Sequence, residues 1–257
     1  MNFPGLPKES IRGVFSDFDD TMTEGSLLHH TTLKAVERLK AANYFVTVVS
    51  GRPAGWADAF IRIFPIDAMV FENGAGVLWK KNGKIVTEIL AESKDLAAQK
   101  KRLEEIFQTL KKKIPHLKLA TDQPYRLFDY AIDFIEEAPH LSQEELKIVL
   151  ETLSTYPDIT HKLSSIHVNY WCGKQTKTTA CEWILKHFKS EGLSKENVIY
   201  CGDSPNDEPL FEFFTQTVGV ANIQKYLSSL KAKPRFVTTE AGGRGFQQVV
   251  DYLLLKG

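Results

Sequence analysis

The sequence has few cysteines, no excess of charge of either sign and no long apolar run, and each shortage excludes a class of protein. Its three cysteines, Cys172, Cys181 and Cys201, form no Cys-x-x-Cys pair among 257 residues. This spacing indicates a reducing compartment and argues against a disulfide framework or a zinc site. The 32 basic and 32 acidic residues cancel, whereas a nucleic-acid-binding protein usually has a basic excess.

Membrane and export signals are equally scarce. The longest apolar segments have the length of a strand and fall far short of a membrane span. The first ten residues, MNFPGLPKES, lack the basic start and apolar stretch of a signal peptide. We therefore expect a cytoplasmic protein with no membrane or nucleic-acid partner.

Short apolar runs alternate with helical patterns in the first and last thirds of the chain. Continuously apolar strands separated by helices are typical of a parallel sheet covered on both faces, which predicts a Rossmann-like α/β core. The strands are predicted at 13–18, 44–50, 68–73, 197–203, 217–221 and 235–239. The helices are predicted at 31–43, 53–64, 177–189, 207–214, 222–230 and 244–255.

Residues 84–171 have a different order of predicted elements, in which a helix followed by two strands occurs twice. The helices are predicted at 92–113 and 142–154, and the strand pairs at 117–121 with 128–135 and at 159–163 with 165–171. This pattern predicts a small α+β domain inserted into the α/β domain, since exposed loops of a parent fold tolerate such insertions. The expected division is a core at 1–83 and 172–257 and an insert, or cap, at 84–171.

Three aspartates follow the first predicted strand within four positions. Asp17 and Asp19 lie on the same side of an extended chain, roughly 7 Å apart along the backbone, whereas Asp20 starts on the other side. An acidic turn bonded to its own backbone would also explain this segment. A second acidic turn, with Asp203 and Asp207, closes another buried strand. Because carboxyl ends of parallel strands share one edge of the sheet, the two turns together indicate a site.

Two more polar segments occupy similar positions. Ser50 and Gly51 directly follow a predicted strand, where a hydroxyl and a backbone N–H could hold an anion; a plain Ser-Gly turn remains the alternative. Lys174 and Lys177 stand near a predicted helix start, which is unfavourable relative to the helix dipole and so favours a role. Ordinary surface lysines remain the alternative there.

A cation would explain why acidic side chains are gathered at one edge. Two unit charges 4 Å apart repel by about 4 kcal/mol at an effective dielectric of 20, so clustering Asp17, Asp19 and Asp203 requires compensation. The candidate ligands are all oxygen atoms, which favours Mg²⁺. The same cation would offset repulsion between a carboxylate nucleophile and a phosphate dianion, an effect of roughly three decades in rate. The sequence therefore predicts a magnesium and phosphoryl site.

These segments resemble the motifs of the haloacid dehalogenase superfamily, in the order that the family has them. DFDDT at 17–21 resembles its Asp-x-Asp-x-Thr motif, VVSGR at 48–52 its Ser/Thr motif, Lys177 its lysine motif and GDSPND at 202–207 its acidic metal motif. FENGA at 71–75 and the place of the insert resemble the type II, Cof-like branch with its C2-type cap. That branch consists mostly of sugar-phosphate phosphatases, together with phosphomannomutases.

The resemblance implies roles for the acidic residues. Asp17 would be the nucleophile that forms an aspartyl-phosphate. Asp19 would be the general acid for the leaving alcohol and then the base for the hydrolytic water. Asp17, the backbone carbonyl of Asp19, and Asp203 would bind Mg²⁺. Asp207 is expected at the same metal site, where it would orient the ligands.

The resemblance also implies how the phosphate is held. Ser50 and Gly51 would bind the transferring phosphate and Lys177 would neutralise it, while Arg52 is expected to contact the substrate. The lysine motif departs from the family, because Thr178 follows Lys177 where glycine is usual; Lys174 therefore remains an alternative.

Supporting residues and cap contacts complete the predicted site. Asn206 and Thr21, both within the matched motifs, are expected to support the metal ligands. The cap should close over the site, exclude water and select the substrate. Its candidate contacts are Arg126, Asp129, His167 and Asn169, although ordinary polar roles would also explain these residues.

The predicted activity is Mg²⁺-dependent hydrolysis of a small phosphorylated metabolite, a sugar phosphate being favoured. A phosphomutase is the nearest enzymatic alternative. A non-catalytic sensor of phosphate or Mg²⁺ is the alternative from another class, and the presence of Asp19 argues against it. No heptad seam in the sequence points to an oligomeric state.

Overall fold

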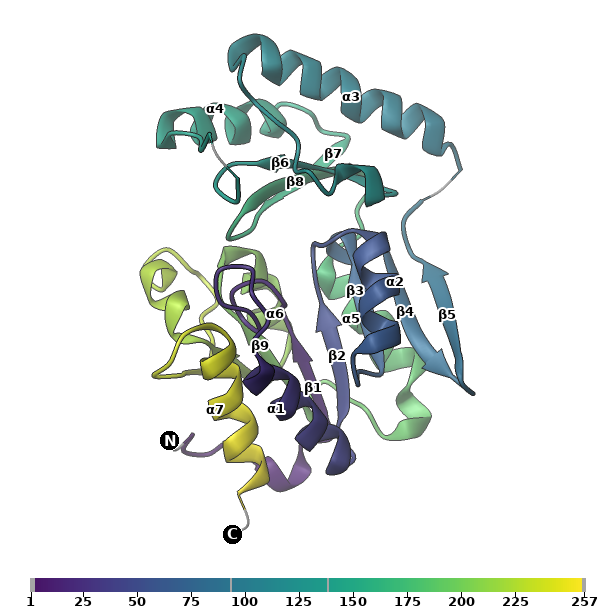
Figure 1. The fold of residues 1–257 in the computed structure, drawn as a ribbon, viewed down its shortest axis with the longest axis vertical. Helices are drawn as coiled ribbons and strands as arrows, with labels where there is room; N and C mark the ends of the chain where they lie inside the picture. The colour runs from purple at the N-terminus through teal and green to yellow at the C-terminus, as the bar shows by residue number, and fades with distance from the viewer. Residues whose placement is uncertain (1–2, 93, 138, 256–257) are drawn as a thin grey trace.

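The computed structural model describes residues 3–92, 94–137 and 139–255, and their strands form two sheets (Figure 1). The larger sheet has the order β11-β10-β9-β1-β2-β3-β4-β5, and the smaller one the order β6-β8-β7. The strands of the larger sheet are β1 (Gly13–Ser16), β2 (Phe45–Val49), β3 (Ala68–Phe71), β4 (Gly76–Lys81), β5 (Lys84–Ile89), β9 (Val198–Gly202), β10 (Gln216–Gly219) and β11 (Phe236–Val237). Those of the smaller sheet are β6 (Asp129–Asp133), β7 (Ile159–Leu163) and β8 (His167–Cys172).

Helices cover both faces of the larger sheet. One face carries α1 (His30–Ala41), α2 (Ala54–Ile63) and α7 (Gly242–Leu254), and the other carries α5 (Lys177–His187) and α6 (Glu208–Phe213). Alternate residues of β1 therefore enter different cores: Val14 packs with the first group of helices and Phe15 with the second. Burial on both sides explains why β1 and its neighbours are continuously apolar.

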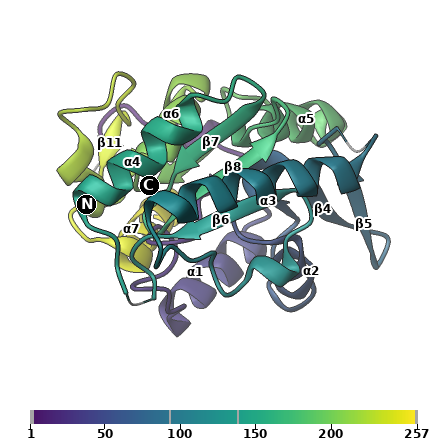
Figure 2. The ribbon, with the colours of Figure 1, turned by 90° about the horizontal axis from the view of Figure 1, so that it is seen from above.

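The smaller sheet has an apolar face and a polar face. Ile132, Val168 and Tyr170 pack against α3 (Leu96–Lys113) and α4 (Gln143–Ser154), which lie across that sheet in Figure 2. The alternating positions carry polar residues such as Asp129 and Asn169, and these are also buried. Because side chains alternate along a strand, this polar face turns toward the larger sheet, which lies below it in Figure 1.

The predicted fold class, a largely parallel α/β core with a cap, is confirmed. Six strands of the larger sheet are parallel, from β11 to β3. Two strands that were not predicted, β4 and β5, extend one edge of the sheet in antiparallel orientation. Their connection through Asn82 and Gly83, both at positive φ, is a two-residue hairpin turn, which leaves no room for a crossover helix.

Three predicted elements have other bounds or another form. The helix predicted at 92–113 begins at Leu96, where the Asp95 side chain caps it by accepting from the Ala98 N–H; residue 93 lies outside the described part of the chain. Residues 117–121 touch β6 only in an isolated bridge, since the chain turns away at residue 122. Residues 221–226 form a 3₁₀ segment, where a longer helix was predicted at 222–230.

The position of β5 also bears on the predicted boundary between core and cap. Residues 84–89 pair with β4 and extend the larger sheet, so a boundary at 83/84 falls inside a hairpin. The connection to the smaller unit lies instead between the end of β5 and the start of α3. Independent folding of the two units stays a prediction.

A turn at the end of β3 fixes the start of α5. Glu72, Asn73 and Gly74 have φ values of 46°, 55° and 108°, a left-handed run that favours glycine. A Cβ atom on Gly74 would lie 2.1 Å from the carbonyl oxygen of Thr176, the residue that precedes α5. The close approach therefore sets the position of Lys177, the first residue of that helix.

We predict that Gly74→Ala lowers the free energy of unfolding by roughly 2 kcal/mol or more, because it combines positive-φ strain with a backbone clash. It should also lower any activity that depends on Lys177. Gly83→Ala is the matched control, since Gly83 has a φ of 74° but no atom within 4 Å of the added Cβ. Urea unfolding measures both variants, and equal losses would contradict this account.

Candidate active site at the carboxyl edge of the larger sheet

The two acidic turns meet because β1 and β9 are adjacent parallel strands in register. Ser16 pairs with Cys201, and the backbone N–H of Asp17 donates to the carbonyl of Cys201 at 2.9 Å. Asp17 and Asp203 thus leave neighbouring strands at the same level. Parallel pairing therefore places the ends of two strands side by side although they are nearly two hundred residues apart in the sequence.

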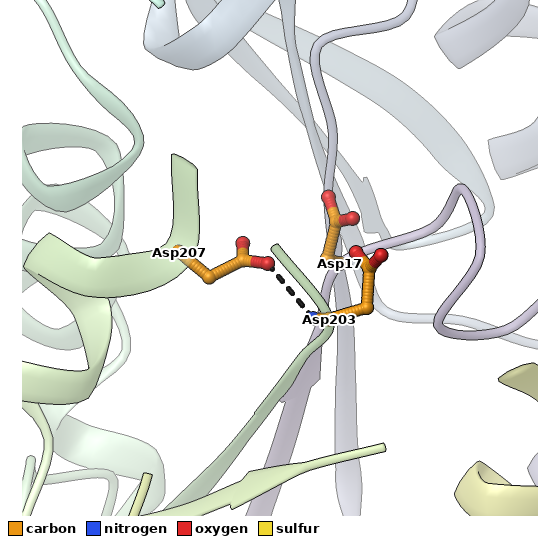
Figure 3. A group of neighbouring side chains, drawn as sticks. All are labelled: Asp17, Asp203 and Asp207. Carbon is orange, nitrogen blue, oxygen red and sulfur yellow. Dashed lines mark hydrogen bonds between the residues drawn. The ribbon is translucent and has the colours of Figure 1, made fainter. Parts of the chain in front are cut away.

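Three carboxylates form a compact buried group at this point. Asp17, Asp203 and Asp207 each offer an oxygen within 4.8 Å of the others, and their exposed fractions are 5%, 1% and 0%. Figure 3 shows the carboxylates of Asp17 and Asp203 side by side, with Asp207 reaching toward them from the following turn. The predicted convergence of residues 17 and 203 is therefore present in the structure.

Burial and mutual repulsion perturb this group. Desolvation, opposed by Lys177 and reinforced by Asp207, raises the pKa of Asp17 to about 8. Desolvation together with Asp17 and Asp207 raises the pKa of Asp203 well above its usual range. Buried carboxylates held this close favour the neutral form unless a cation is present, so the arrangement has the electrostatic character of a cation site.

Asp207 is the most fully hydrogen-bonded of the three. One carboxylate oxygen accepts from the Tyr200 hydroxyl at 2.6 Å and from Lys177 Nζ at 3.2 Å. The other accepts from the backbone N–H groups of Asp203 at 3.0 Å and Ser204 at 3.2 Å. Asp207 therefore fixes the turn that carries Asp203.

Lys177 supplies the positive charge of the site. Its Nζ lies 2.6 Å from Asp17 Oδ1, and its side chain is buried. Burial disfavours the ammonium, but Asp17 and Asp207 outweigh it and raise the pKa of Lys177 above its usual value. Lys174 is exposed, so the structure brings Lys177 into the acidic group and leaves Lys174 at the surface.

Asp19 lies apart from the acidic group. Its carboxylate receives both Nε and Nη2 of Arg52 at 2.9–3.1 Å. The guanidinium is 3% exposed and stacks over Trp56 at 4.6 Å. Because the Asp19 side chain is paired with Arg52, only the backbone carbonyl of Asp19 remains as the predicted metal ligand.

The remaining predicted residues surround the same group. Thr21 Oγ1 lies 3.4 Å from Asp203 Oδ1. The buried Ser50 hydroxyl accepts from the Arg52 N–H at 3.0 Å. Gly51 and Asn206 line a small pocket between Asp17 and the cap.

Two neighbours of the site were not predicted from the sequence. Tyr200 lies inside a buried strand, and its hydroxyl bonds to Asp207. Asn222 donates through Nδ2 to the Asp20 carbonyl at 2.8 Å and to Asp203 Oδ2 at 3.2 Å. Neither residue belongs to a motif, so only the three-dimensional arrangement identifies them.

The predicted cap residues fall into two groups. His167 and Asn169 line the pocket together with Asp17, Asp19, Gly51, Arg52 and residues 164–166. Arg126 and Asp129 instead form a buried pair at 2.9 Å beside it, and Arg126 also donates to the Gly51 carbonyl at 2.9 Å. Because the pocket has a volume of about 20 Å³, it holds one or two water molecules, and a substrate can enter only if the cap moves.

The carboxylate of Glu72, which lies outside the acidic group, connects the core to the cap. It accepts from the backbone N–H groups of Leu127, Phe128 and Asp129 in the cap at 2.6–3.1 Å, and from that of Ala54 in the core at 2.9 Å. Desolvation and the nearby Asp129 raise the pKa of Glu72 to about 7, against the effect of these donors. The FENGA segment thus has a structural role that its sequence alone does not indicate.

The chain thus combines a Rossmann-like sheet, a buried acidic group at the carboxyl edge of that sheet and an α+β cap above it. Residues 14–127 match the family described as haloacid dehalogenase-like hydrolase. A curated phosphoglycolate phosphatase from Methanothrix thermoacetophila is 26% identical over 250 residues, which cover 96% of this chain and 99% of the relative. The chain is thus similar to haloacid dehalogenase-like hydrolases over residues 14–127, and to a relative named as a phosphatase over nearly its full length.

Solved structures share the fold. Thermoplasma acidophilum 0175 aligns with a TM-score of 0.74 at 16% identity, covering 95% of this chain and 98% of that one. The sucrose-phosphatase of Synechocystis sp. PCC6803 aligns with a TM-score of 0.63 at 17% identity, covering 94% and 97%. Among the described helices, none combines the length and apolar character that crossing a membrane requires.

We predict that Asp203→Asn stabilises the metal-free protein, raising its Tm by roughly 5 °C, because it removes a buried, repelled carboxylate. The same variant should lose most of the Tm increase that Mg²⁺ gives the unsubstituted protein. Asp158→Asn is the control, since Asp158 is half exposed in a surface pair with Arg102 and its loss should change Tm little. A lower Tm for metal-free Asp203→Asn, with the Mg²⁺ effect retained, would contradict the electrostatic account.

A second prediction concerns pH. Because the pKa of Asp17 is raised to about 8, this carboxyl is largely protonated below pH 8, and a cation such as Mg²⁺ would have to displace the proton there. Mg²⁺ affinity should therefore rise from pH 6 to pH 8, with proton release on binding below pH 8. Calorimetry in two buffers of different ionisation enthalpy measures the released proton. Affinity independent of pH, without proton release, would be the opposite result.

Proposed function

We propose that the protein is a Mg²⁺-dependent phosphatase that hydrolyses a small phosphorylated metabolite through an aspartyl-phosphate on Asp17. The observation that supports this most is the buried group of Asp17, Asp203 and Asp207 around Lys177. A buried group of repelling carboxylates beside an ammonium suits a site that binds a cation and a phosphoryl group, and phosphoryl transfer depends on such groups.

The residues present fit a hard divalent cation. Three carboxylates and one ammonium leave two negative charges in the group, and oxygen ligands suit Mg²⁺. Asp17, Asp203 and the backbone carbonyl of Asp19 would hold the ion, while Asp207, already bonded to four donors, would orient them. Bound there, Mg²⁺ would neutralise charge on the nucleophile and on the phosphoryl oxygens.

The chain's own groups account for the two steps. Lys177 holds Asp17 Oδ1, so we assign the attack on phosphorus to Oδ2. Ser50, Gly51 and Lys177 would bind the phosphoryl oxygens that carry the developing charge. Asp19 would give its proton to the oxygen of the leaving alcohol, and then take one from the water that hydrolyses the aspartyl-phosphate.

The substrate follows less directly from the site. The sequence favours a sugar phosphate, and sucrose-phosphatase shares the fold, but the relative that aligns over the full length bears the name phosphoglycolate phosphatase. We therefore propose a small phosphate monoester as the substrate. A cytoplasmic location and the absence of nucleic-acid partners stay predictions from composition.

The activity is tested with p-nitrophenyl phosphate, in Mg²⁺ or EDTA, on the unsubstituted protein and on Asp17→Asn. We expect release of p-nitrophenol that requires Mg²⁺ and falls by at least about three decades in the variant, because the nucleophile is lost. Asp58→Asn, a change in an exposed surface pair with Arg62, is the control and should retain activity.

Other outcomes identify the alternatives. Isomerisation of a hexose phosphate without free phosphate would indicate a phosphomutase. Binding of phosphate or Mg²⁺ without turnover would indicate a sensor. Equal hydrolysis by Asp17→Asn and the unsubstituted protein would show that Asp17 is not the nucleophile.

A further inference from the structure

The pocket between Asp19 and the cap is bordered by two buried basic side chains, Arg52 and His167. They come from different units: Arg52 follows β2 of the core, and His167 begins β8 of the cap. Both are at most 3% exposed. In a phosphatase, the part of the substrate beyond the phosphoryl group extends from Asp17 past Asp19, which is where these two side chains lie.

The carboxylate of Glu136 lies between Arg52 and His167. Glu136 Oε1 accepts from Arg52 Nη2 at 2.6 Å, and Oε2 lies 3.4 Å from Nη1. Oε2 also lies 2.8 Å from His167 Nε2. This geometry demonstrates that Arg52 and His167 together accommodate one planar, two-oxygen anion, the arrangement that a guanidinium fork recognises.

Glu136 satisfies this pair incompletely. His167 Nε2 is buried and lies 2.8 Å from Glu136 Oε2, but without the angles of a well-aligned hydrogen bond. The contact of Glu136 with His167 is therefore close but poorly aligned, at a pocket that already contains the reacting groups.

Glu136 is also the partner of Arg52 that can leave most readily. Its side chain is 21% exposed, compared with 16% for Asp19 and 9% for Asp122, the other two carboxylates on Arg52. The Asp133 carboxylate accepts from the backbone N–H groups of residues 135, 136 and 137 and fixes that backbone. Glu136 is thus the most exposed of the three carboxylates, on a backbone that is fixed independently of its side chain.

We propose that Arg52 and His167 form the subsite for a carboxylate carried by the leaving group of the substrate, and that Glu136 occupies this subsite until the substrate replaces it. The proposal rests on the phosphatase function proposed above and names the class of substrate: a small phosphate monoester whose alcohol bears a carboxylate. Exchange of one carboxylate for another leaves the number of charges around Arg52 unchanged. A neutral leaving group would leave Arg52 and His167 short of an acceptor.

The test compares two substrates that differ only at the proposed contact. These are 2-phosphoglycolate, which bears a carboxylate, and 2-hydroxyethyl phosphate, in which a neutral hydroxymethyl group replaces it. The unsubstituted protein should prefer 2-phosphoglycolate by roughly tenfold or more in kcat/KM, since charge-assisted hydrogen bonds to a carboxylate are lost with the neutral compound.

Three variants assign the preference to residues. His167→Ala should raise KM for 2-phosphoglycolate several-fold and reduce the preference, with little change in kcat for either substrate. Glu136→Gln should lower KM for 2-phosphoglycolate alone, because the competing charge is removed. His161→Ala, on the adjacent strand β7 and bonded toward Ser154, is the matched control and should leave the preference unchanged.

A measurement on the unsubstituted protein guards against variants that fail to fold. Glycolate should inhibit hydrolysis of p-nitrophenyl phosphate competitively, at concentrations where ethylene glycol has no effect. Equal use of both substrates, a preference that survives in His167→Ala, or equal inhibition by the two alcohols would overturn the subsite while leaving the phosphatase function intact. Loss of all Mg²⁺-dependent hydrolysis, including that of p-nitrophenyl phosphate, would overturn both.

Discussion

Mutual repulsion among three buried carboxylates is the constraint around which the rest of the molecule is arranged. Asp17, Asp203 and Asp207 come within 4.8 Å of one another in a nearly solvent-free position, and Lys177 offsets only one of their charges. Such a group destabilises the folded chain unless a cation joins it. The surrounding structure holds it in place: Tyr200 and two backbone N–H groups fix Asp207, and Asn222 with Thr21 fixes Asp203.

The fold creates this group from distant segments, and the cap closes over it. The pairing of β1 with β9 supplies two of the carboxylates, and the left-handed turn at 72–74 positions the helix that carries Lys177. The same turn presents Glu72 to the backbone of the cap. Arg52 then connects the two units, since it contacts Asp19 in the core and both Asp122 and Glu136 in the cap. Arg52 thus links the position of the Asp19 carboxylate to the contacts that hold the cap.

Much of this arrangement follows from the sequence, because strand-end motifs in a parallel sheet have a predictable destination. The positions of Asp17 and Asp203 at one edge required only the alternation of apolar strands and helices, whereas Lys177 was preferred to Lys174 through the resemblance to the family's lysine motif. The antiparallel β4–β5 edge was not predicted. A hairpin is identified by its turn, and the prediction relied only on the alternation of strands and helices. The contacts of Glu72 and Glu136 were not predicted either, since each depends on residues from distant segments, Glu72 on Leu127 and Glu136 on Arg52. Side-chain pairing across a domain interface leaves no periodic signal in one sequence.

The central claim is that the carboxylates of residues 17 and 203 share one divalent cation, and crystallography with Mn²⁺ in place of Mg²⁺ tests it most directly. The account predicts one anomalous-difference peak about 2.1 Å from an oxygen of each carboxylate, with Lys177 still bonded to Asp17. A well-occupied Mn²⁺ elsewhere on the protein, with the acidic group protonated and free of metal, would contradict it.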